Sequence, residues 1–162
     1  MSNDIPAMWM RGGTSKGLYF LKNDLPSNKV ERDKFLLSIF GSPDRLQING
    51  IGGGNPLTSK VAIISKSKKP DIDIDYLFLQ VSVDNTLVSD TQNCGNILAG
   101  IAPFAIERGL VKPKYGHGET SVKIYMENTK QMAIASVQTP KGKITYKGET
   151  YIDGVPKPSS PI

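Results

Sequence analysis

Cysteine, histidine and tryptophan are nearly absent from this sequence of 162 residues, which holds one of each. A single cysteine excludes a disulfide within the chain and suits a reducing compartment. His117 and Cys94 stand far apart without metal-ligand spacing, so we predict no metal site and treat His117 as a loop residue. No apolar run approaches the about 20 residues of a membrane-spanning helix. The start of the chain lacks a secretion signal, and we expect a cytoplasmic protein with no membrane partner.

Charge of one sign is not concentrated in the chain, although the formal net charge is +5. The densest basic run, 66–69, is followed by a proline and alternating aspartates over 70–75, a pattern typical of a solvated turn between strands. Dispersed lysines do not form the basic stripe that nucleic acids require, so we predict no nucleic-acid partner. A modest positive balance instead favours attraction of small polyanionic substrates.

Most apolar residues follow the pattern of β-strands. Enrichment in β-branched and aromatic residues predicts strands at 5–10, 17–21, 60–65, 76–83, 121–126, 132–138 and 143–146. Alternation within 76–83 indicates a strand that is buried on one face only.

Two segments carry helical spacing instead. The first, 28–40, has a cap at Ser27 or Asn28 and a stop at Gly41. The second, 97–109, follows Cys94 and contains Pro103, which we expect to kink the helix or to require local compensation. Together the elements predict an α+β fold in which a strongly bent sheet or barrel-like layer covers one central helix.

Cys94 stands in the polar stretch Asn93–Asn96, where the second helix is expected to begin. A thiol at a helix N-terminus meets unpaired backbone N–H groups and the positive end of the helix dipole, and both favour the thiolate. The same N–H groups suit a substrate carboxylate or a developing enolate. The alternative is a small buried hydrophobic residue, because free cysteine is often buried. The polar setting favours the functional interpretation.

Two glycine-rich segments hold further candidates. Lys60 ends the segment 49–60 at the mouth of an apolar strand, where partial desolvation would suit a lysine base. The ordinary alternative is a strand-end lysine whose amine reaches water. The segment 11–17, Arg-Gly-Gly-Thr-Ser-Lys-Gly, combines cations, hydroxyls and glycines that suit a carboxylate or phosphate. Its glycine–lysine spacing is wrong for a Walker loop, and a plain surface hairpin is the alternative.

Taken in order, these segments resemble the PrpF family of aconitate and methylaconitate isomerases, relatives of diaminopimelate epimerase and proline racemase. The resemblance runs over essentially the whole chain and rests on Met8–Gly17, Gly52–Gly54, Thr58–Val61, Asn93–Asn96 and Ile152–Pro156. It implies a diaminopimelate epimerase-like domain, with a curved mixed sheet or open barrel around a central helix. It also implies that neither a metal nor an organic cofactor takes part.

The resemblance implies that Lys60 and Cys94 form the acid/base pair for proton transfer. The residues that would line the substrate cleft are Arg11, Thr14, Ser15, Lys16, Ser59, Asn93, Gly95 and Asn96. The expected activity is a cofactor-independent shift of the double bond in an unsaturated di- or tricarboxylate of the methylaconitate or aconitate type, in propionate metabolism. A small polycarboxylate is the expected partner.

Members of this family are considerably longer than this chain, so the resemblance implies an N-terminal half. We expect an epimerase-like domain over 1–151 and, over 152–162, the start of a crossover to a second domain absent from this chain. The exposed apolar surface would then be covered by a second copy or by a separate C-terminal half. Two alternatives stay open: an amino-acid epimerase or racemase of the same fold, and an inactive truncated binding or assembly module.

Overall fold

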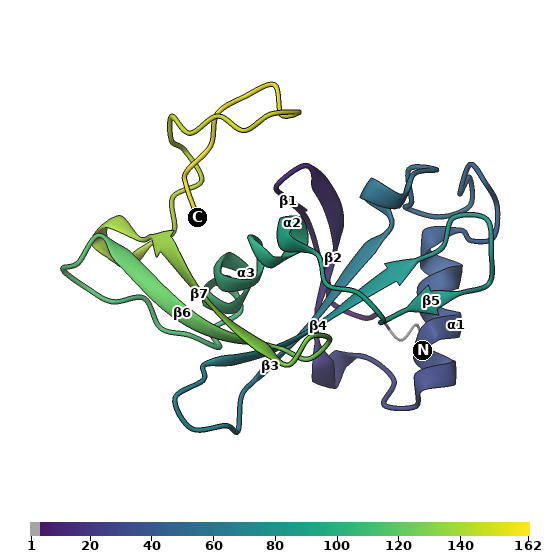
Figure 1. The fold of residues 1–162 in the computed structure, drawn as a ribbon, viewed down its shortest axis with the longest axis horizontal. Helices are drawn as coiled ribbons and strands as arrows, with labels where there is room; N and C mark the ends of the chain where they lie inside the picture. Colours follow the sequence, from purple (N-terminus) through teal and green to yellow (C-terminus); the bar gives the residue numbers. More distant parts are fainter. Residues whose placement is uncertain (1–3) are drawn as a thin grey trace.

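A curved mixed sheet organises residues 4–162, the part of the chain that the computed structural model describes (Figure 1). Its strands are β1 (Met8–Gly12), β2 (Ser15–Leu21), β3 (Lys60–Lys66), β4 (Ile74–Val81), β5 (Val88–Ser89), β6 (Glu119–Met126) and β7 (Gln131–Gln138). They lie in the order β1-β2-β3-β4-β6-β7, and the short β5 pairs with β4 outside this path. The β2–β3 and β4–β6 pairs are parallel and the others antiparallel. The expected α+β class and curved mixed sheet are confirmed.

One expected strand, 143–146, is wrong. A 3-10 turn, η3 (Pro140–Gly142), turns the chain off the end of β7, so this segment has no ladder partner. Isolated backbone hydrogen bonds reach it instead, from the N–H of Lys143 to the carbonyl of Pro140, from the N–H of Thr145 to that of Gln138, and from the N–H of Ser160 to that of Tyr146. The remaining six expected strands are present with shifted ends, whereas β5 is too short for its alternation to be detected.

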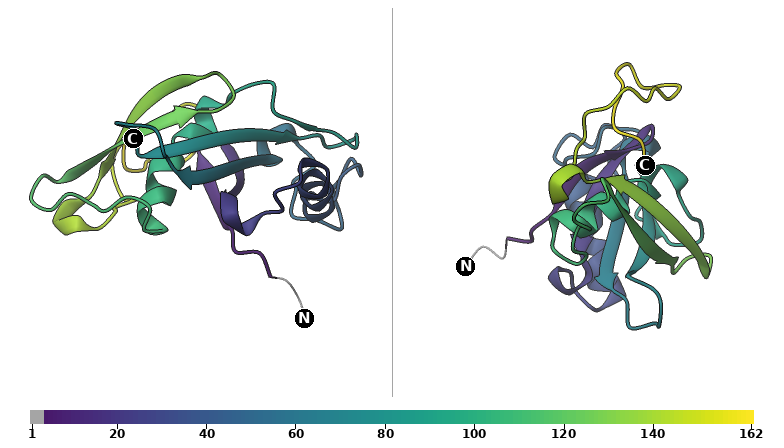
Figure 2. Two further views of the ribbon diagram at one scale, coloured as in Figure 1. Left: turned by 90° about the horizontal axis from the view of Figure 1, so that it is seen from below. Right: turned by 90° about the vertical axis from the view of Figure 1, so that its left-hand side faces the viewer.

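The central strands bury apolar side chains on both faces of the sheet. On β4, Tyr76 and Phe78 belong to a core beneath the helices that follow Cys94, while Leu79 and Val81 belong to a second core on the opposite face. The alternation at 76–83 indicated a strand that is buried on one face only. This prediction is therefore wrong. Helices lie on both sides of the sheet, as the views in Figures 1 and 2 show, and the two cores beneath them bury side chains on both faces of β4.

Helix α1 (Lys29–Phe40) covers the second core. Asn28 is its N-cap, as expected, because its side-chain oxygen accepts from the N–H groups of Val30 (2.9 Å) and Glu31 (3.2 Å). Gly41 ends the helix in the left-handed region, with φ of 82°. Leu36 lies fully buried against the sheet, whereas Val30 in the first turn is exposed.

The helix expected after Cys94 is two short helices, α2 (Gly95–Leu98) and α3 (Ile101–Glu107). The break falls at Gly100, where a Cβ would overlap the ring of Tyr19, so glycine permits the close approach. Pro103, in the first turn of α3, has no N–H to offer the carbonyl of Ala99 four residues back, so the disturbance expected from this proline falls at the break between α2 and α3. Residues 101–106 are buried within the curve of the sheet, so the expected central helix is confirmed.

The chain after η3 loops out of the body of the fold and returns, as the yellow segment in Figures 1 and 2 shows. Thr150 and Ser159 pair across this loop as an isolated bridge. The bridge joins residues on either side of the expected domain boundary at 151/152, which stays a prediction. No helix in the described part of the chain is long and apolar enough to cross a membrane.

Candidate functional site

Neighbouring strands arrange the surroundings of Lys60 in rows across the face of the sheet that lies under α2 and α3. Residues two positions apart on a strand point to the same face, about 7 Å apart. The pairing register gives three rows: Gly17–Lys60–Gln80, Tyr19–Ala62–Phe78 and Leu21–Ile64–Tyr76. A side chain that takes part in proton transfer and points from β2, β3 or β4 to this face therefore belongs to one of these three rows.

Lys60 is 9% exposed, and its amine does not extend freely into water as the ordinary alternative required. Its Nζ donates to Oε1 of Gln80 at 2.9 Å and lies 5.2 Å from the centre of the Phe78 ring. The side chain thus extends from its own row toward the next. Gln80 is itself fixed, because its Nε2 donates to the carbonyl of Ser59 at 2.9 Å and to that of Pro56 at 3.1 Å.

The sequence analysis missed Gln80 as a site residue. The available signal was its position: an amide in an apolar strand, which the antiparallel register places beside Lys60.

Cys94 is the N-cap of α2, so its expected position at a helix start is confirmed. The helix holds four residues, so the dipole behind the thiol is that of about one turn rather than of a long helix. Cys94 is partly buried and packs against the core beneath α2 and α3. Partial burial fits neither a fully buried hydrophobic residue nor a freely exposed thiol, and the role of Cys94 stays a prediction.

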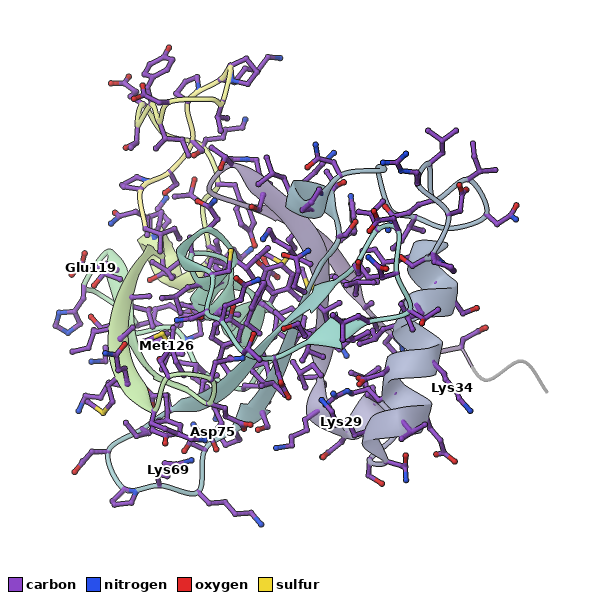
Figure 3. The ribbon with its side chains drawn as sticks, turned by 45° about the vertical axis from the view of Figure 1, so that its right-hand side comes forward. Lys29, Lys34, Lys69, Asp75, Glu119 and Met126 are labelled. Carbon is purple, nitrogen blue, oxygen red and sulfur yellow. The ribbon has the colours of Figure 1, made fainter. Side chains whose placement is uncertain are left out.

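Asn93 ties this thiol to the sheet. Its side-chain oxygen accepts from the N–H of Cys94 at 2.8 Å, and its Nδ2 lies 2.7 Å from Sδ of Met126. Met126 ends β6 (Figure 3) and pairs in register with Tyr76 of β4. The residue before Cys94 is thus attached to the strand that pairs with β4 at Tyr76.

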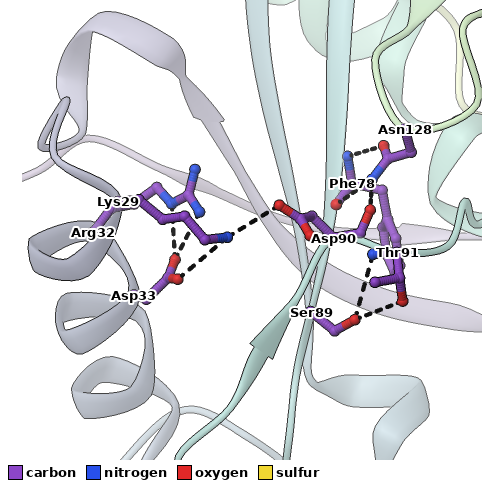
Figure 4. A network of polar contacts seen from close by, with 8 residues as sticks. All are labelled: Lys29, Arg32, Asp33, Phe78, Ser89, Asp90, Thr91 and Asn128. Carbon is purple, nitrogen blue, oxygen red and sulfur yellow. Dashed lines mark hydrogen bonds and ion pairs between the residues drawn. The ribbon is translucent and has the colours of Figure 1, made fainter.

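A polar network fixes the chain just before this thiol (Figure 4). The side chain of Asn128 donates to the carbonyls of Phe78 (2.9 Å) and Asp90 (2.8 Å) and accepts from the N–H of Phe78 (2.8 Å). Lys29 of α1 donates to the Asp90 carboxylate at 3.0 Å, and this hydrogen bond lowers the pKa of Asp90 below its usual range. The approach to Cys94 is therefore attached to both β4 and α1.

Two buried tyrosines lie on the same face of the sheet as Cys94. The Tyr19 hydroxyl donates to the carbonyl of Ile97 in α2 at 2.8 Å. The Tyr76 hydroxyl is buried and has no hydrogen-bond partner within the described residues 4–162. Burial raises the pKa of both phenols above the ordinary value; Cys94 adds to the rise at Tyr19, and Tyr19 and then Cys94 add to it at Tyr76. The thiol and the two hydroxyls therefore interact electrostatically, which residue spacing alone did not indicate.

The β1–β2 hairpin packs against the start of α2 through Asn96. The Asn96 Nδ2 donates to the hydroxyl of Thr14 at 3.0 Å and to that of Ser15 at 3.4 Å. A Cβ on Gly12 or Gly13 would overlap Asn96, so both glycines permit this contact. Four of the expected substrate-binding positions, Thr14, Ser15, Gly95 and Asn96, are thus brought together.

A cleft of about 970 Å³ opens beside this contact. Arg11, Thr14, Gly95 and Asn96 line it together with α3 and the C-terminal segment. Arg11 lies at its edge and donates to the carbonyl of Gly13 at 2.7 Å and to the hydroxyl of Ser159 at 3.2 Å. Lys60 and Cys94 do not line this cleft. Its walls therefore contain some of the expected binding residues but neither residue of the expected proton-transfer pair.

Two expected binding residues lie elsewhere. Lys16 is exposed and alternates with Ser15 on β2, which places it toward the opposite face of the sheet. The Ser59 hydroxyl is buried and donates to the side chain of Gln47 and to the carbonyl of Asn55, both at 3.0 Å. Ser59 therefore organises the glycine-rich loop in this structure.

No group of three or more metal-ligating side chains is present in residues 4–162. His117, expected to be a loop residue, is exposed in the turn before β6.

The curved sheet around a central helix, with a thiol at the N-cap beneath the hairpin contact, defines a diaminopimelate epimerase-like domain. The chain belongs to the PrpF family, because the family profile described as "PrpF protein" matches residues 2–162. A solved structure titled "Crystal Structure of Methylitaconate-delta-isomerase" agrees, with a TM-score of 0.92 and 47% sequence identity over 96% of this chain and 69% of that chain.

Curated relatives match this chain over less than half of their own length. A protein named (4E)-oxalomesaconate Delta-isomerase, from Novosphingobium sp. (strain KA1), is 62% identical over 99% of this chain and 44% of its own length. A protein named 4-oxalomesaconate tautomerase, from Pseudomonas putida, is 58% identical over 94% of this chain and 42% of its own length.

Proposed function

We propose that this chain carries the proton-transfer site of an isomerase that moves the double bond of a small unsaturated polycarboxylate. The supporting observation is that Lys60 and Cys94 share one face of the sheet, with the Lys60 amine extending toward the row that contains Phe78. The names of the two relatives favour an oxalomesaconate-type keto acid over an aconitate-type acid as substrate. The reaction is proposed to need no cofactor and to take place in the cytoplasm.

In the proposed reaction, the neutral amine of Lys60 removes a proton from the carbon next to the double bond. The electron pair spreads over the alkene and a neighbouring carbonyl or carboxylate as a dienolate. The Cys94 thiol then protonates the far end of this system, so the double bond moves and no atom is gained or lost. Proton return from the ammonium to the thiolate through solvent restores the site.

Gln80 suits a lysine that must act as a base. Its amide oxygen accepts from Nζ without adding a negative charge, whereas a carboxylate in the same place would favour the ammonium. Lys60 is buried beside the Phe78 ring, so its amine is held away from bulk water on this face of the sheet. The substrate carboxylates are proposed to meet Arg11, Thr14, Ser15 and Asn96, with Asn93 and Gly95 shaping the turn.

Solvent-deuterium exchange into the substrate tests the proposed pair. The 162-residue chain and the polypeptide of the complete reading frame are assayed with an oxalomesaconate-type keto acid and with aconitate. We expect Lys60→Ala and Cys94→Ser each to reduce exchange by at least about 100-fold, the scale of general acid–base catalysis. Lys66→Ala, an exposed lysine at the far end of the same strand, is the matched control. Near wild-type exchange in both site variants would contradict the proposal.

Two further arms separate the alternatives. Racemisation of a free amino acid without alkene isomerisation would indicate the epimerase alternative. Absence of any exchange in the complete polypeptide would indicate a binding or assembly module. The 162-residue chain is proposed to associate with a second copy or with a separate C-terminal half, which gel filtration with light scattering measures.

A further inference from the structure

We propose that Tyr76 is a positioning residue for Cys94, with its hydroxyl donating a hydrogen bond to the thiolate form of that cysteine. The catalytic consequence rests on the proposed function, but the contact itself does not. Tyr76 has no part in the proton-transfer pair described above.

The Tyr76 hydroxyl lacks a partner where one is most needed. The side chain is fully buried on β4, and its oxygen has no hydrogen-bond partner within the described residues 4–162. A buried hydroxyl without a partner is costly, so its persistence in a packed core calls for a group that it meets in some state of the protein.

Cys94 is the group that the fold places on the same side of the sheet as Tyr76. Tyr76 pairs in register with Met126, and the Asn93 side chain joins Met126 to the residue just before the thiol. Cys94 packs against the apolar core to which Tyr76 belongs. Burial raises the pKa of Tyr76, and Tyr19 and then Cys94 add to the rise, which agrees with Cys94 lying on the same side of the sheet as this hydroxyl.

The other tyrosine on this face already has a role. Tyr19 donates its hydroxyl proton to the carbonyl of Ile97 and thereby holds α2. The ionisable groups that face Cys94 from the sheet are Tyr19 on β2, Lys60 on β3 and Tyr76 on β4, and Lys60 is bound to Gln80. Asp90, on the approach to Cys94, is paired with Lys29. Besides the backbone N–H groups at the start of α2, Tyr76 is therefore the side-chain donor on this face that is left for the thiolate.

A buried phenol suits this task because it stays neutral. Burial disfavours the charged tyrosinate, so the O–H proton remains available at the pH of the reaction. A hydrogen bond to the charged form of a group favours that form. Tyr76 would thus make Cys94 a stronger acid and speed the protonation of the dienolate.

The pH dependence of Cys94 alkylation tests this contact without any isomerase activity. Cys94 is the chain's single cysteine, so mass spectrometry assigns iodoacetamide modification without ambiguity. In Tyr76→Phe, we expect the pH of half-maximal alkylation rate to rise by about one unit or more, the scale of a hydrogen bond to a charged group. Tyr125→Phe is the matched control, since Tyr125 neighbours Met126 on the opposite face of β6.

An unchanged alkylation profile in Tyr76→Phe, with the protein still folded by circular dichroism, would overturn the proposal. The same shift in Tyr125→Phe would also overturn it, because the effect would then not depend on the buried hydroxyl.

Kinetics of the complete polypeptide then separate the contact from the reaction. We expect Tyr76→Phe to lower kcat about 10-fold with little change in KM, because the hydroxyl does not touch substrate. An alkylation shift in a protein without isomerase activity would support the contact and contradict only the proposed function. Isomerase activity with an unshifted profile would contradict only the contact.

Discussion

Lys60 and Gln80 are joined across the β3–β4 pair by a hydrogen bond of 2.9 Å from the amine to the amide oxygen. The glutamine is held in turn by two backbone carbonyls of the glycine-rich loop, those of Pro56 and Ser59. The position of the Lys60 amine is therefore set by the neutral amide of Gln80, which the loop in turn holds in place. The hydrogen bond to Gln80 directs the buried amine of Lys60 over the Phe78 ring, on the face of the sheet where Cys94 also lies.

Replacing Gln80 tests that relationship. Gln80→Leu removes the acceptor, and we expect kcat of the complete polypeptide to fall about 10-fold as the amine loses its direction. Gln80→Glu keeps an acceptor but adds a charge that favours the ammonium, so activity should appear only at higher pH. The pH–rate profiles of both variants measure this. Identical profiles for Gln80→Glu and the wild type would contradict a base role for Lys60.

The two buried tyrosines should differ in their contribution to stability. Tyr19→Phe removes one of two donors to the carbonyl of Ile97, the N–H of Gly100 at 3.0 Å being the other, and we expect the free energy of unfolding to fall by about 0.5–1.5 kcal/mol. Tyr76→Phe removes a hydroxyl without a partner in this structure, so the free energy of unfolding should stay the same or rise. Urea denaturation measures both. Equal losses would show that the Tyr76 hydroxyl is satisfied in the resting protein.

Glycines of the hairpin should be less replaceable than the glycine of the helix. A Cβ at position 12 would overlap the backbone oxygen of Asn96, so Gly12→Ala should lower the free energy of unfolding by about 1–3 kcal/mol. A Cβ on Gly95 meets no heavy atom within 4 Å, and Gly95→Ala should be neutral or stabilising because alanine favours helix. Denaturation of the two variants provides the comparison. Similar losses in both would contradict tight hairpin–helix packing.

Alkaline titration should separate three tyrosines. Burial raises the pKa of Tyr146 to about 12, with the nearby Glu107 carboxylate adding to the rise. Burial also raises the pKa of Tyr19 and Tyr76 above the ordinary value. Because these folded values exceed the unfolded value of about 10, the stability they contribute is present below that pH and is lost as pH rises through the folded values.

Tyrosinate absorbance followed with circular dichroism measures this titration. We expect Tyr146 to ionise in the folded protein near pH 12, and Tyr19 and Tyr76 only as the fold is lost. The double variant Tyr19→Phe/Tyr76→Phe should lack the two late ionisations. Ionisation of either buried phenol with an intact fold would show that water reaches it.

The sequence by itself determined the elements whose causes are local. Alternating β-branched and aromatic residues made six strands detectable, and Asn28 and Gly41 marked the ends of α1 through capping chemistry and a left-handed stop. Cys94 was placed at a helix start by the polar stretch around it. The ordered glycine-rich segments led to the PrpF family, and the family profile confirms that membership.

Tertiary structure alone decided what depends on residues far apart in the chain. The register of β3 with β4 placed Gln80 beside Lys60, and the ring of Tyr19 lies so close to Gly100 that only glycine fits at the break between α2 and α3. Burial on both faces of β4 removed its expected solvent face and left the Tyr76 hydroxyl buried without a hydrogen-bond partner within residues 4–162. Local patterns set which residues form strands and helices, because backbone preferences act over a few positions. Strand register and the packing of helices on the sheet set which side chains meet.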